Sequence, residues 1–215
     1  RAAMTVDVDD ILLVSGSLQA LDLVNQTLLR PGDTVVIEAS NYGGVYTRFR
    51  HLDVNFASVP TDAEGMRIDA LEDILDGLKA KGITPRYIYT IPTVQNPTGT
   101  VMPEDRRRGL LALAERYDLP VFEDDCYADL TFDGARPPAL HALDDTGRVI
   151  YCGSFSKTIA PAFRVGYLVA SPAFLQRALS YKTDAGSGAL EQMVLAEFCD
   201  GQFDSHVEKL AAHLA

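Results

Sequence analysis

One lysine in this sequence has the neighbours that covalent chemistry needs. Lys157 lies in Ser154-Phe155-Ser156-Lys157-Thr158, shortly after the apolar run Val149–Cys152, and Arg164 follows it. A loop lysine is most often a solvated surface charge. Hydroxyls and a guanidinium, however, suit a phosphate dianion, and a partly desolvated lysine among cations can form a bond with a carbonyl carbon. The segment therefore indicates either a solvated loop or a phosphate site that holds a reactive amine.

Three consecutive acidic residues, Glu123-Asp124-Asp125, follow the apolar run Leu119–Phe122 and precede Cys126 and Tyr127. Such a triplet is commonly a solvated loop. A carboxylate at the end of a buried strand is costly to desolvate unless a cation compensates its charge. The triplet is therefore open to three interpretations: a solvated loop, ligands of a divalent metal, or the counter-charge of a protonated ring nitrogen in a cofactor.

Two further polar segments follow predicted strands. Ser15-Gly16-Ser17-Leu18-Gln19 comes after Ile11–Val14 and opens a helix, so its free backbone amides could bind an anion, or a serine could simply cap the helix. Gln95-Asn96-Pro97-Thr98-Gly99 comes after Tyr87–Thr90. The segment is either a plain turn or a turn in which the rigid proline holds Asn96 so that its side chain can donate a directed hydrogen bond.

These segments are positioned by alternating strands and helices. The strand candidates are short, apolar runs bounded by turn residues: Ile11–Val14, Thr34–Glu38, Asn55–Val59, Tyr87–Thr90, Pro120–Glu123, Val149–Cys152 and Val165–Ala170. Helical periodicity covers Leu18–Leu29, Gly44–Leu52, Ile68–Lys81, Pro103–Tyr117 and the region from Pro172 onward, with a linker at Asp184–Gly188.

The alternation predicts the α/β class, as a three-layer αβα sandwich around a mostly parallel, seven-stranded mixed sheet. The last two strands are too close in sequence for a helical crossover, so we expect them to be antiparallel. In open sheets of this kind, ligands bind at the carboxyl ends of strands and at helix N-termini. The four polar segments occupy those positions.

Composition excludes several classes of protein. The 215 residues are 47% hydrophobic and 23% charged, which is typical of a globular domain, and a net charge of −11 argues against nucleic-acid binding. We find neither a membrane-spanning apolar run nor a signal peptide. Cys126, Cys152 and Cys199 are odd in number and widely spaced, which predicts reduced thiols in a cytoplasmic protein rather than disulfides or a metal site. Because the chain starts at Arg1, we interpret it as part of a longer polypeptide.

Taken in order, the four polar segments resemble the fold type I pyridoxal-phosphate enzymes of the class I/II aminotransferase family. The resemblance runs from about Ile11 to Ala170. It is carried by Ser154-Phe155-Ser156-Lys157-Thr158, Arg164-Val165-Gly166-Tyr167, Asn96-Pro97-Thr98-Gly99, Asp124 and Tyr127.

The resemblance implies three catalytic residues, Lys157, Asp124 and Tyr127. Lys157 would hold the aldehyde of pyridoxal 5'-phosphate as an aldimine and move a proton between the substrate Cα and the cofactor C4′. Asp124 would pair with the protonated pyridine nitrogen. Asn96 and Tyr127 would hydrogen-bond the ring oxygen, and Tyr42 would stack on the ring. The phosphate would lie on backbone amides and side chains of Gly16, Ser17, Leu18, Ser154, Ser156 and Arg164.

The sequence also departs from the family pattern. Leu18 stands where close relatives often carry glutamine, and Ser40 stands where proline is common. The substrate-carboxylate arginine of the family lies in a C-terminal small domain, whereas the last arginine here is Arg177. We therefore expect residues 1–185 to form the cofactor-binding large domain and residues 186–215 to be a helical segment leading toward that small domain. The family also implies a homodimer in the full-length protein.

Three functions remain open at this point. The first is an aminotransferase that moves an α-amino group from an amino acid to a 2-oxo acid, similar to the 2-aminoadipate and kynurenine aminotransferase branch. The second is the aminotransferase-like domain of a winged-helix transcription regulator. The third is a magnesium-dependent phosphotransfer enzyme that uses Asp124 and Asp125 on the metal and Lys157 on phosphate.

Overall fold

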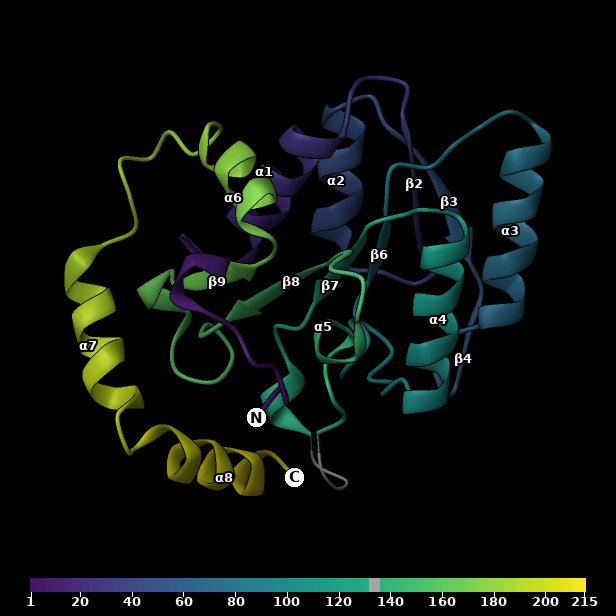
Figure 1. Ribbon diagram of the computed structural model, residues 1–215. Coiled ribbons are helices and arrows are strands. Elements are labelled where there is room, and N and C mark those ends of the chain that lie inside the picture. Colours follow the sequence, from purple (N-terminus) through teal and green to yellow (C-terminus); the bar gives the residue numbers. More distant parts are fainter. Residues whose placement is uncertain (132–135) are drawn as a thin grey trace.

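The computed structural model describes residues 1–131 and 136–215, and its centre is a seven-stranded sheet (Figure 1). The strand order is β1-β9-β8-β7-β6-β2-β3, in which β9 is antiparallel to both neighbours and every other pair is parallel. The predicted mixed sheet and its antiparallel pair are thus confirmed. The strands are β1 (Ile11–Val14), β2 (Thr34–Glu38), β3 (Asn55–Val59), β6 (Ile88–Thr90), β7 (Val121–Asp124), β8 (Val149–Ser154) and β9 (Gly166–Val169).

The helices that sequence periodicity predicts up to Tyr117 all form, with ends within one residue of the expected positions. The region after Pro172 contains three helices separated by irregular segments, and the expected linker lies between the first two. The helices are α1 (Ser17–Leu28), α2 (Gly43–His51), α3 (Ile68–Ala80), α4 (Glu104–Arg116), α5 (Leu140–Leu143), α6 (Pro172–Leu179), α7 (Ala189–Cys199) and α8 (Phe203–Leu214), with 3₁₀ turns η1 (Val8–Asp10), η2 (Ala128–Leu130) and η3 (Pro161–Phe163). A small hairpin, β4 (Thr61–Asp62) with β5 (Gly65–Met66), and the short α5 are not predicted.

Alternate strand residues enter two different cores, which gives the molecule its three layers. Val35 and Ile37 of β2 pack with α1, α2 and α6 on one face, whereas Val36 packs with α3, α4 and α5 on the other. Because the central strands are buried on both faces, their sequences are continuously apolar. The predicted αβα sandwich is therefore confirmed (Figure 1).

The sheet topology brings the polar segments to one edge. Strands β6, β7 and β8 are parallel, and β1 runs in the same direction because β9 is antiparallel to both β1 and β8. The carboxyl ends of these strands and the start of α1 therefore share one edge. Gly16 turns the chain from β1 into α1 with a φ of 83°. Gly166 lies so close that an added Cβ would be 3.2 Å from the Gly16 Cα.

None of the helices in the described part of the chain combines the length and the apolar character that crossing a membrane requires. The three cysteines are free thiols.

Candidate active site

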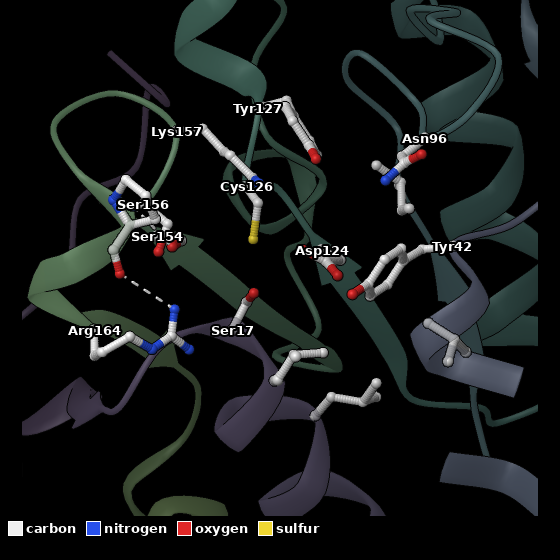
Figure 2. A pocket seen from close by; sticks show the side chains of 15 residues that line it. Ser17, Tyr42, Asn96, Asp124, Cys126, Tyr127, Ser154, Ser156, Lys157 and Arg164 are labelled. Carbon is white, nitrogen blue, oxygen red and sulfur yellow. Dashed lines mark hydrogen bonds between the residues drawn. The ribbon is translucent and has the colours of Figure 1, made fainter. Parts of the chain in front are cut away.

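One cavity at the carboxyl edge of the sheet collects the predicted site residues (Figure 2). Gly16 is the only predicted residue that does not line the cavity. It lies against the side chain of Arg164, since a Cβ added to Gly16 would be 2.5 Å from Nη2 of that arginine. The predicted residues that line the cavity are Ser17, Leu18, Tyr42, Asn96, Asp124, Tyr127, Ser154, Ser156, Lys157 and Arg164. Leu21, Val45, Ile91, Cys126 and Pro161 complete it.

Asp124 ends β7 and presents its carboxylate to this cavity. The hydroxyl of Tyr89, a buried residue of β6, donates to Asp124 Oδ2 at 2.6 Å. Burial raises the pKa of the Asp124 carboxyl, and hydrogen bonds from Cys126 and Tyr89 oppose that rise. A carboxylate in such surroundings is stabilised by a cationic partner. A protonated ring nitrogen would supply that charge.

Lys157 lies in the loop after β8, and its side chain lines the same cavity. The Nζ atom lies 5.4 Å from the centroid of the Tyr127 ring, within the range of a cation–π contact. Tyr127 follows β7 and Lys157 follows β8, so the pairing of these neighbouring strands brings the two side chains together. The amine therefore lies beside Tyr127 in the cavity that Asp124 also lines.

The start of α1 can bind an anion. Its N-cap is Gly16, which has no side chain, and within the described residues no acceptor contacts the backbone amides of Ser17 and Leu18. The simple serine cap considered from the sequence is therefore wrong. Arg164 lies over this end and donates to the Ser15 carbonyl at 3.2 Å. Helix amides and a guanidinium together suit a phosphate.

A buried network missed from the sequence holds the loop that carries Asn96. Gln95 Nε2 donates to Glu38 Oε2 at 3.1 Å and to the Ser40 carbonyl at 2.6 Å, while its Oε1 accepts from the Thr98 amide at 2.9 Å. Glu38 also accepts from Thr90 Oγ1 at 2.8 Å, and burial raises its pKa to about 7. The sequence feature that could have indicated this network is Glu38, a charged residue at the end of the otherwise mostly apolar strand β2.

Tyr42 precedes α2 and directs its hydroxyl toward Asp124 (Figure 2). Its ring lies against Gly44, where any larger side chain would overlap the ring carbons. The ring can therefore lie flat at the side of the cavity. This position suits stacking on a planar ligand.

The rest of the acidic triplet faces away from the cavity. Asp125 forms an ion pair with Arg136 at 2.5 Å, and Glu123 accepts from the amides of Leu140 and His141 at 2.8 and 3.0 Å. Both carboxylates are buried, so the solvated-loop interpretation is wrong. Asp124 lines the cavity, whereas Asp125 is paired with Arg136 outside it. The two carboxylates therefore cannot bind one magnesium ion together, as the phosphotransfer hypothesis requires.

Comparison with known proteins shows the family of the chain. The family model for aminotransferase class I and II matches residues 2–215. The chain belongs to this aminotransferase family. Among curated proteins, the aromatic-amino-acid aminotransferase 1 of Thermococcus litoralis is 39% identical to it over 204 residues, which are 94% of this chain and 49% of the relative. The chain spans about half the length of the curated relatives that it matches first.

Solved aminotransferase structures agree with the fold. The Pyrococcus horikoshii kynurenine aminotransferase, solved in complex with PMP, superposes with a TM-score of 0.90 and 40% identity, covering 94% of this chain and 51% of that one. An HTH-type transcriptional regulator of Bacillus subtilis is 36% identical over 214 residues, which are 98% of this chain and 43% of the regulator. Membership of this aminotransferase family indicates pyridoxal phosphate as the cofactor.

Proposed function

We propose that the protein containing this chain is a pyridoxal-phosphate-dependent aminotransferase that moves an α-amino group from an amino acid to a 2-oxo acid. One observation carries the proposal: a single cavity presents a lysine amine, a buried carboxylate and an anion-binding helix start. These three groups match the aldehyde, the ring nitrogen and the phosphate of the cofactor. When bound, the cofactor supplies a ring that withdraws electrons from the substrate Cα.

Each of these side chains then has a defined role. Lys157 Nζ holds the cofactor and afterwards carries a proton at the substrate Cα. Asp124 keeps the ring nitrogen protonated, and that positive charge in turn stabilises the desolvated carboxylate. Tyr127 and Asn96 hydrogen-bond the ring oxygen, and Tyr42 stacks on the ring. The phosphate is bound by the start of α1 after Gly16, with donors from Ser17, Leu18, Ser154, Ser156 and Arg164.

The proposal extends to the organisation of the whole protein. Residues 1–185 form the cofactor-binding domain, and residues 186–215 lead toward a further domain. This division is supported by α7, which leaves Leu190 and Met193 each 71% exposed. We also propose a cytoplasmic homodimer, on the strength of the free cysteines and of the family. A net charge of −11 gives no support to a nucleic-acid partner.

The regulator alternative is not favoured. The aminotransferases described above are 39% and 40% identical to this chain, and the regulator is 36% identical. The two aminotransferases, with the higher identities of the three, therefore support catalysis.

The proposal is tested on the full-length protein. Added pyridoxal phosphate should give a visible absorption band, and borohydride should then fix the cofactor on the peptide that contains Lys157, as mass spectrometry will report. Lys157→Ala should abolish the attachment, whereas Lys81→Ala, at the exposed end of α3, should not. An amino acid added before borohydride should discharge the band as a 2-oxo acid appears. Labelling at another lysine, or no labelling, contradicts the proposal.

A further inference from the structure

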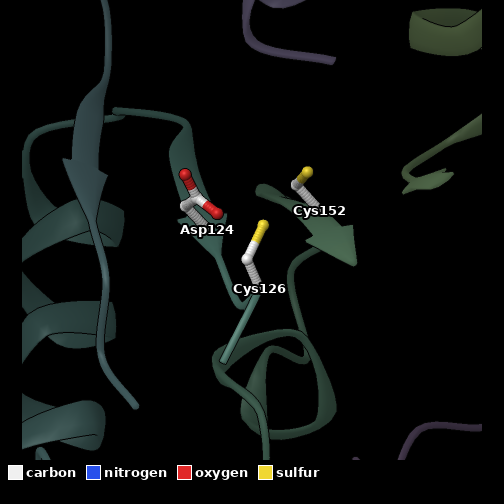
Figure 3. A group of neighbouring side chains, drawn as sticks. All are labelled: Asp124, Cys126 and Cys152. Carbon is white, nitrogen blue, oxygen red and sulfur yellow. The ribbon is translucent and has the colours of Figure 1, made fainter. Parts of the chain in front are cut away.

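Two thiols lie beside Asp124 and have no place in the proposed reaction (Figure 3). Cys152 is paired with Asp124 in the β7–β8 register, and Cys126 follows Asp124 by two residues. One ligand atom from each of the three residues lies within 4.8 Å of the other two. The wide spacing of these cysteines in the sequence gave no sign of this proximity. The strand pairing creates it.

We propose that the Asp124–Cys126–Cys152 cluster binds one thiophilic divalent cation, such as Zn²⁺ or Cd²⁺. Cysteine thiolates and aspartate oxygens are both zinc ligands, and thiolates select soft metals over magnesium or calcium. Cys152 is fully buried, whereas Cys126 lines the cavity. The cation can therefore enter from the cavity, which Asp124 also lines.

The surroundings of the cluster fit a metal site. The Tyr89 hydroxyl donates a hydrogen bond to Asp124 Oδ2 at 2.6 Å and so fixes the orientation of the carboxylate. Hydrogen bonds of this kind orient the ligands in known metal sites. Cys152 is fixed within β8, and its carbonyl accepts from the Asp125 amide at 2.9 Å. Because thiolate is the form that coordinates a metal, binding releases the thiol protons.

The Asp124 carboxylate cannot bind the metal cation and the protonated ring nitrogen of the cofactor at the same time. If Asp124 coordinates the metal, it no longer pairs with the ring nitrogen of the cofactor. Cation and pyridoxal phosphate should therefore compete, a consequence that rests on the proposed function. Binding of the cation to the cofactor-free protein does not rest on it.

The first experiment titrates the full-length, cofactor-free protein with Cd²⁺ under anaerobic conditions. Wild-type protein should bind one Cd²⁺ with the ultraviolet charge-transfer absorption of cadmium thiolates. Cys126→Ser and Cys152→Ala should each weaken binding at least tenfold, and Cys199→Ser, a matched change in α7, should not. Absence of the absorption, or equal affinity in Cys126→Ser, overturns the proposal. If Cys152→Ala does not fold, as circular dichroism will report, Cys126→Ser decides, because Cys126 lines the cavity.

The second experiment tests the competition. Saturating Cd²⁺ should raise the apparent Kd for pyridoxal phosphate at least tenfold, and excess pyridoxal phosphate should remove the cadmium absorption. In Cys126→Ser, the same Cd²⁺ concentration should raise the apparent Kd of the cofactor much less than in the wild type. Simultaneous binding of both ligands contradicts the competition. If the protein binds no pyridoxal phosphate at all, the proposed function fails, while the cadmium titration still decides the metal site.

Discussion

The Asp124 carboxylate depends on a partner from a neighbouring strand. Tyr89 is fully buried in β6, and burial raises the pKa of its hydroxyl well above the ordinary value. The hydroxyl therefore remains protonated and donates to Asp124. The ring also stacks on Phe122 with a centroid separation of 5.5 Å, which holds it in the core. The carboxylate thus has a fixed orientation before any ligand arrives, and such preorganisation is what electrostatic catalysis requires.

Replacing Asp124 with asparagine tests the role of its negative charge while nearly preserving the shape of the side chain. Asp124→Asn keeps an oxygen that can accept from Tyr89 but removes the negative charge. We expect the single-turnover half-reaction with an amino acid to slow by roughly 100-fold or more, because the ring nitrogen loses its counter-charge. Stopped-flow absorption of the bound cofactor measures this rate. Asp145→Asn, at an exposed position, is the control. An unchanged rate in Asp124→Asn would remove Asp124 from the proposed site.

Residue types and their order predict the cavity lining well, but not its supports. The polar segments after the strands contain every expected site residue except Tyr42, which the family resemblance implied, and all of the expected residues except Gly16 line one cavity. Tyr89 and Gln95 were missed because a tyrosine within a strand looks like any core aromatic, and a glutamine in a turn looks solvated. Only the three-dimensional pairing of strands shows that Tyr89 reaches Asp124 and that Gln95 reaches Glu38.

At the scale of elements, a substitution in the turn from β1 into α1 can separate an effect on stability from an effect on cofactor binding. Gly16→Ala places a Cβ 2.5 Å from Arg164 Nη2 at a φ of 83°, while Gly32→Ala meets nothing within 4 Å at a similar φ of 86°. Both changes should destabilise the fold by about 1 kcal/mol through backbone strain. Only Gly16→Ala should also displace the guanidinium, raising the Kd for pyridoxal phosphate roughly tenfold through a lost charged hydrogen bond.

Thermal unfolding and a fluorescence titration with the cofactor measure these two effects. Equal cofactor affinity in the two variants would show that Arg164 does not bind the phosphate. Weakened affinity in Gly32→Ala would instead point to a general loss of structure.

Element types follow from sequence where an element is long enough to show its period. The helices up to Tyr117 are well predicted because apolar residues repeat over about 2.5 turns or more. The hairpin of β4 and β5 is missed because each strand has two residues, too few to alternate. In the C-terminal region the first break, at the linker Asp184–Gly188, is expected, whereas the second, between α7 and α8, is not. Gly186 and Gly201 adopt positive φ angles of 108° and 89° there, and a helix cannot continue through such residues.

For the whole molecule, Glu38 couples folding to pH. Burial raises the pKa of its carboxyl from 4.5 to about 7, so the folded state binds the proton more tightly than the unfolded state. The resulting stability is fully present below about pH 4.5 and is lost as the pH rises through about 7. The free energy of unfolding should therefore fall by about 3 kcal/mol over this range relative to Glu38→Gln, which does not titrate.

Urea unfolding of both proteins across this pH range measures the difference, and other titrating groups cancel in the comparison. Glu115→Gln, at an exposed position of α4, should parallel the wild type. A constant difference between wild type and Glu38→Gln would mean that Glu38 remains ionised in the folded protein.

The outer position of β3 in the sheet has a practical consequence. β3 pairs with β2 on one side and ends the strand order on the other. Its sequence, Asn55–Val59, contains no charged residue, and Phe56 is 40% exposed. Natural proteins protect such strands with lysines, prolines or bulges, since unpaired backbone groups recruit strands from other molecules. Aggregation at high concentration should therefore start along this strand, and Ser58→Lys is the substitution to make before crystallisation.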